Sequence, residues 1–118
     1  MSEKFAEWSK DKNFNSNVKS ILFEIYETFS VKSEDTKLLK KRISFGEAKG
    51  QKNRYIIAFW EANSVKLQVK AEMYANITDF GFGNPSINEH GQKGYVELKI
   101  TEASQIDKNL KSYLIKGF

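Results

Sequence analysis

The chain has 118 residues, 40% of them hydrophobic and 14% aromatic, with a formal net charge of +4. This length excludes a second domain, so residues 1–118 are expected to form one, and the absence of cysteine excludes disulfides, thiolate metal ligands and thiol nucleophiles. No apolar run approaches the roughly 18 residues that span a bilayer, and the N-terminus lacks a signal-peptide pattern, so we expect a cytoplasmic protein without membrane partners.

The first elements in chain order are two helices. Phe5 and Trp8 would share one face of a short helix, which with its linker occupies residues 1–13 and is expected to pack at the edge of the domain. Residues 13–17 supply good N-cap side chains, and helical spacing then predicts a helix over about residues 17–30. Its apolar positions are Val18, Ile21, Leu22, Ile25, Tyr26 and Phe29.

A hairpin over residues 54–74 is predicted to be the centre of an antiparallel sheet. Residues 65–73 alternate strictly between apolar and polar side chains, which is typical of a half-buried strand. In the other arm, residues 55–61, both sides are apolar, so the sequence leaves open which face of the sheet is buried. A first strand containing residues 42–45 precedes the hairpin, and a last strand follows at residues 95–101.

The remaining segments are a long loop and a final helix. Residues 75–94 contain four of the seven glycines and the only proline, which indicates a functional or mobile loop. Thr101 or Ser104 is expected to cap a C-terminal helix. The predicted fold class is α+β: residues 14–118 form an α-β-β-β-β-α core, a four-stranded antiparallel sheet with one helix before it and one after it packed on one face. The residues of the last helix expected to face the sheet are Ile106, Leu110, Tyr113 and Leu114.

Positive charge concentrates between Lys37 and Arg54, where seven cations face Glu47 alone, a net of +6 that leaves −2 for the rest of the chain. Such segregation indicates a surface for phosphate or for an acidic protein partner. It is equally typical of a lysine-rich sheet edge that prevents pairing between molecules. The candidate binding residues are Lys40, Lys41, Arg42, Arg54, Lys66, Lys70, His90 and Lys99.

Several strand segments, one loop and the final helix together resemble a known family. The segments are Arg42–Phe45, Tyr55–Phe59, Ser64–Val69, His90 and Gly94–Leu98. From about residue 17 to the end, the chain resembles a bacterial domain family of unknown function. That family often forms the C-terminal module of proteins with a restriction-nuclease-like domain, some of them labelled predicted transport proteins.

A histidine-aromatic-glycine loop, leading through Gly-Asp into the last strand, is the more specific feature of that family. His90, Gly94 and Glu97 fit its spacing here, whereas Gly91 replaces the aromatic residue and Tyr95 replaces the acid. The resemblance implies an association with nucleic-acid-handling or defence proteins.

A nuclease is one alternative. Asp79 followed by Glu97 and Lys99 resembles the aspartate and Glu-x-Lys pattern with which one nuclease superfamily binds magnesium. Alternate strand residues share a face, and carboxylates with a lysine can hold a hard cation beside a phosphate. Glu and Lys two residues apart are also common on the solvent-exposed faces of antiparallel strands. His90 is the only histidine, so no histidine cluster for zinc can form, and we expect no metal or other cofactor.

These observations favour a non-catalytic binding module that uses a basic sheet face and is associated with nucleic-acid-handling or defence proteins. Its partner would be the nucleic-acid phosphate backbone or an acidic protein. The alternatives are a protein–protein adaptor or small inhibitor domain, with a homodimer through the sheet left open, and the metal-dependent nuclease.

Overall fold

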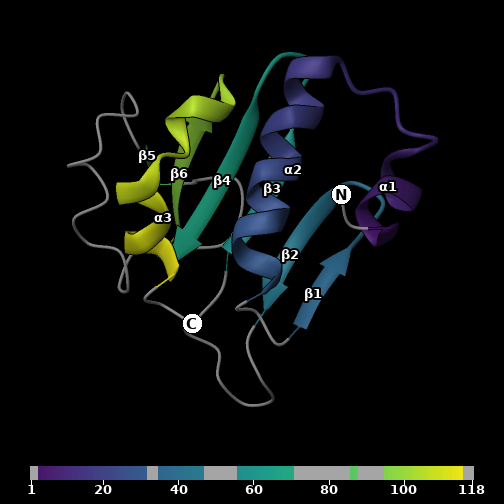
Figure 1. Cartoon of the computed structure of the whole chain (residues 1–118). Helices are drawn as coiled ribbons and strands as arrows, with labels where there is room; N and C mark the ends of the chain where they lie inside the picture. The colour runs from purple at the N-terminus through teal and green to yellow at the C-terminus, as the bar shows by residue number, and fades with distance from the viewer. Residues whose placement is uncertain (1–2, 32–34, 47–55, 71–85, 88–94, 116–118) are drawn as a thin grey trace.

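The structure is an antiparallel sheet with helices on one face (Figure 1). This computed structural model describes residues 3–31, 35–46, 56–70, 86–87 and 95–115. Within them, six strands pair in the order β1-β2-β3-β4-β6-β5. The strands are β1 (Asp35–Leu38), β2 (Arg42–Gly46), β3 (Ile56–Trp60), β4 (Val65–Lys70), β5 (Ser86–Ile87) and β6 (Tyr95–Ile100). The helices are α1 (Glu3–Ser9), α2 (Ser16–Ser30), the 3-10 turn η2 (Ala103–Gln105) and α3 (Lys108–Ile115).

The predicted α+β class and antiparallel sheet are confirmed, but the predicted number of four strands is wrong. The four predicted strands correspond to β2, β3, β4 and β6, and the described sheet also contains β1 and the two-residue β5. With β1 there are five strands of four or more residues. A four-residue strand is too short for alternation to be recognised, and β1 is held mainly by its pairing with β2. The Leu39 N–H closes their connection by donating to the Arg42 carbonyl at 2.9 Å.

Helix α2 is the main cover of the sheet and packs across β2, β3 and β4. It begins at Ser16, one residue before the predicted start, because the Asn15 side chain accepts from the Val18 N–H at 2.7 Å. All six apolar positions predicted for it are buried. The Asn15 amide also donates to the Ala62 carbonyl at 2.6 Å and to Asn63 Oδ1 at 3.0 Å. The start of α2 is thereby fixed to the turn between β3 and β4.

Helix α3 lies beside α2 on the same face of the sheet (Figure 1). The predicted caps Thr101 and Ser104 are wrong, because the Asp107 carboxylate accepts from the Leu110 N–H at 2.9 Å where α3 begins. The segment before it forms η2, where the Gln105 side chain accepts from the Thr101 N–H at 2.7 Å. Ile106, Leu110 and Leu114 are buried as predicted, and Tyr113 is partly buried against the core.

Both faces of the central strands contain buried side chains. On the helix-covered face, Ile56 and Ala58 of β3 are fully buried. On the second face, Ile57 is only 1% exposed, while Phe59 is half-buried. The sequence did not decide which face of β3 is buried, and in the structure buried side chains lie on both of its faces. The strand residues in the main core are Ile43, Phe45, Ile56, Ala58, Val65, Leu67, Val69, Leu98 and Ile100.

Some predicted features lie outside the described residues: the ends of the hairpin at residues 54–55 and 71–74, and the loop at 75–94 apart from β5. None of the helices in the described part combines the length and apolar character needed to cross a bilayer.

The short helix α1 lies near β1 at one edge of the sheet (Figure 1), as predicted, yet it contributes to the core. Phe5 is fully buried, and its ring lies 5.5 Å from the rings of Phe23 and Tyr26 of α2. The Trp8 indole N–H donates to the Leu39 carbonyl, in the β1–β2 turn, at 2.8 Å. These contacts make α1 part of the fold.

The burial of Phe5 predicts a large effect of Phe5→Ala. Removing a fully buried aromatic ring should lower the free energy of unfolding by about 3–5 kcal/mol, whereas Glu7→Ala on the exposed side of α1 should change it by less than about 0.5 kcal/mol. Urea unfolding followed by circular dichroism measures both. A loss below about 1 kcal/mol for Phe5→Ala would contradict the view that α1 belongs to the core.

Candidate binding surface

A line of side chains crosses the second face of the sheet near the β1–β2 and β3–β4 turns. The strand register pairs Arg42 with Phe59, Phe59 with Lys66, and Lys66 with Lys99. Directly paired residues of antiparallel strands project from the same face, so these four form one row, which we call the cation row. Arg42 and Lys99 are exposed, and Phe59 and Lys66 are half-buried. With strands about 4.8 Å apart, the row is about 14 Å long.

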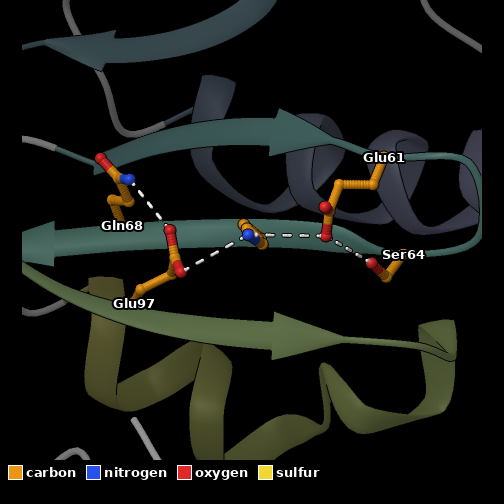
Figure 2. A network of polar contacts seen from close by, with 5 residues as sticks. Glu61, Ser64, Gln68 and Glu97 are labelled. Carbon is orange, nitrogen blue, oxygen red and sulfur yellow. Dashed lines mark hydrogen bonds and ion pairs between the residues drawn. The ribbon is translucent and has the colours of Figure 1, made fainter. Parts of the chain in front are cut away.

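Lys66, at the centre of this row, lies between two carboxylates. Its Nζ is 3.6 Å from Glu61 Oε1 and 3.9 Å from Glu97 Oε2. Gln68 donates from Nε2 to Glu97 Oε1 at 3.0 Å, and the Ser64 hydroxyl donates to Glu61 Oε1 at 3.3 Å (Figure 2). The positive charge of Lys66 is therefore offset locally. Gln68, which alternation placed on a polar outer face, is only 6% exposed.

The other candidate cations are less constrained. Lys40 and Lys41 are exposed in the β1–β2 turn, immediately before Arg42. Among the described residues, no ion pair involves Lys40, Lys41, Arg42 or Lys99. Of the remaining predicted binding residues, Lys70 ends β4 and its side chain is not described, while Arg54 and His90 lie outside the described residues.

Two of the three nuclease candidates lie on the same face. Glu97 and Lys99 are two residues apart in β6, as predicted, and Asp79 lies outside the described residues. The Glu97 side chain is 21% exposed and already contacts Lys66 and Gln68. Across the described segments, no three His, Cys, Asp or Glu side chains gather in a way that could hold a metal ion.

A groove that the sequence did not reveal lies at the same end of the molecule, with a volume of about 510 Å³. The α1–α2 loop, the β1–β2 turn and the β3–β4 turn form its walls, and we call it the tryptophan groove. Its lining residues are Lys12, Asn13, Phe14, Asn15, Lys40, Lys41, Trp60, Glu61 and Ala62.

Aromatic rings form one side of the tryptophan groove. The Trp60 ring meets Phe14 at a centroid distance of 5.1 Å and an angle of 88°, and it meets Trp8 at 5.4 Å and 82°. Such edge-to-face contacts are a preferred geometry of aromatic pairs. Lys12 Nζ lies 5.0 Å from the centroid of the Trp8 ring, a cation–π distance. Lysines and half-buried aromatic rings thus adjoin in one groove.

A second groove, of about 810 Å³, lies between α1, α2 and β1. Among its described lining residues, the charged side chains are Glu3, Glu7 and Lys4, a net charge of −1. Because acids outnumber bases there, it is less suited to an anionic ligand than the tryptophan groove.

Compared with known proteins, the chain matches no family model, no curated protein and no solved structure. The resemblance to the bacterial domain family therefore stays a prediction, and the chemistry of the site is derived from this chain's own geometry.

The carboxylate network predicts unequal effects of removing its two acids. Glu97→Ala leaves the buried Gln68 amide without its acceptor and should cost about 1–3 kcal/mol of unfolding free energy. Glu61→Gln removes the half-exposed charge beside Lys66 but keeps an acceptor for the Ser64 hydroxyl, and should cost less than about 1 kcal/mol. Urea unfolding of both variants measures the difference, and equal losses would mean that the Gln68 contact contributes nothing beyond the ion pair.

Proposed function

We propose that this chain is a non-catalytic nucleic-acid-binding module that holds the phosphate backbone at the turn end of its sheet. Arg42 and Lys99 on the cation row, with Lys40 and Lys41 in the adjoining turn, are the proposed phosphate ligands. The observation that supports the proposal most directly is the strand register, which aligns Arg42 and Lys99 on one face.

The charge of this region supports an anionic partner. Six cations lie on the cation row or in the tryptophan groove at the same end of the molecule, and two carboxylates accompany them, giving a net charge of +4. Both carboxylates lie beside Lys66, so the charges of Arg42 and Lys99 are not offset in the same way. The cations are Lys12, Lys40, Lys41, Arg42, Lys66 and Lys99, and the acids are Glu61 and Glu97.

The types and spacing of these side chains favour backbone contacts over base reading. Five of the six cations are lysines, which act as point charges, whereas arginine is the usual bidentate reader of guanine. Successive phosphates of one duplex strand rise about 3.4 Å each, so a row of about 14 Å spans about four of them. We therefore expect affinity with little dependence on base sequence.

The double variant Arg42→Ala/Lys99→Ala tests the proposed ligands. Removing two phosphate contacts should make the negative slope of log affinity against log salt less steep, reducing its magnitude by about 1.8 for duplex DNA. Fluorescence anisotropy of a labelled duplex between 50 and 200 mM salt measures this slope. The charge-matched control is Lys4→Ala/Lys108→Ala, two exposed lysines of α1 and α3, and its slope should equal that of the unsubstituted chain.

An acidic protein partner would use the same cations, so a competition experiment separates it from nucleic acid. If the partner is nucleic acid, unlabelled DNA should displace the labelled duplex at a far lower concentration of negative charge than polyglutamate does. Equal competition per charge would favour the adaptor alternative. Absence of duplex and single-strand binding at 50 mM salt, or a ligand variant indistinguishable from the control, would overturn the proposal.

A further inference from the structure

The tryptophan groove combines the two features that bind unpaired nucleotides. Its charged residues are Lys12, Lys40, Lys41 and Glu61, a net charge of +2. Phe14 and Trp60 add half-buried rings to the same lining. Proteins that bind single strands pair a positive groove with aromatic side chains on which bases stack. A volume of about 510 Å³ is within the range of small-ligand pockets.

The walls of this groove are fixed by contacts between residues far apart in the sequence. Asn15 joins the α1–α2 loop to the β3–β4 turn through Ala62 and Asn63. Trp8 joins α1 to the β1–β2 turn through the Leu39 carbonyl. The Trp60 ring packs nearly perpendicular to the rings of Phe14 and Trp8, which also contact each other. A ligand therefore meets a formed groove, and little ordering free energy has to be supplied on binding.

We infer that the tryptophan groove is a subsite for an unpaired nucleotide of single-stranded nucleic acid, with its base against Trp60 and Phe14 and its phosphate beside Lys12, Lys40 and Lys41. This inference rests on the proposed function, because Lys40 and Lys41 are proposed phosphate ligands there and also line the tryptophan groove. A single strand on the cation row reaches the groove by passing over the β1–β2 turn. A duplex base reaches the groove only after leaving its stack, which costs free energy.

The subsite makes the chain prefer single strands. Stacking one base on an aromatic side chain contributes about 5- to 150-fold in affinity. A single-stranded 12-nucleotide oligothymidylate should therefore bind more tightly than a duplex of the same length at the same salt concentration. The duplex keeps its backbone contacts with Arg42 and Lys99 and does not use Trp60.

Anisotropy titrations of Trp60→Leu with both probes test this subsite. We expect single-strand affinity to fall about 5- to 150-fold and duplex affinity to change by less than twofold. Tyr113→Leu, a partly buried aromatic residue of α3 that does not line the groove, is the matched control and should leave both affinities unchanged. Trp60→Phe keeps a ring and should restore most of the single-strand preference.

A spectroscopic measurement covers the case in which Trp60→Leu fails to fold. Because Trp8 and Trp60 are the only tryptophans and Trp60 is the one that lines the groove, the tryptophan emission of the unsubstituted chain reports whether the groove is occupied. Oligothymidylate should quench this emission and the duplex should not. Equal affinity for both probes, or single-strand binding without quenching, would overturn the subsite while leaving the proposed function standing. Absence of binding of both probes to the unsubstituted chain would instead overturn the proposed function.

Discussion

The register of β2, β3, β4 and β6 is the constraint on which the rest of the structure depends. A slip of one residue moves every side chain of a strand to the opposite face of the sheet. In β4, such a slip would bring Lys66 into the core and expose Leu67, which is now fully buried. The apolar face that α2 covers therefore fixes the register. The positions of the exposed cations on the second face follow from this packing.

The turn end of the sheet is organised around Asn15. Its side chain accepts from the Val18 N–H and donates to Ala62 and Asn63, so one residue caps α2 and holds the β3–β4 turn. The turn is closed by the Glu61 N–H, which donates to the Ser64 carbonyl at 2.8 Å. Because the same turn holds Glu61 beside Lys66 and follows Trp60, the carboxylate network and the tryptophan groove share one rigid support.

Periodicity predicted the parts of the fold that carry long patterns. Helix α2 and strand β4 were recognisable because many residues repeat with one period. Strand β1 was missed because four residues carry too little pattern, and the cap of α3 was misplaced because Thr101, Ser104 and Asp107 are all good capping residues.

The basic turn and the Glu97–Lys99 pair were visible in the sequence, but the groove was not. Its walls depend on contacts between residues 31 to 48 positions apart, and no local pattern encodes such contacts. The burial of Gln68 was missed for a related reason. Alternation assigns a polar residue to the solvent side of a strand. The Gln68 amide is buried instead, because Glu97 on β6 accepts its hydrogen bond in place of water.

Trp8 connects the core to the tryptophan groove. Its ring packs against the core and also contacts Phe14 and Trp60, which line the groove. Undocking of α1 would therefore remove support from the groove before the sheet itself opens. By thermodynamic linkage, any ligand that binds only the formed groove must also stabilise the docked state of α1. The first helix would then report occupancy through the hydrogen-exchange protection of its amides, although none of its own residues lines the groove.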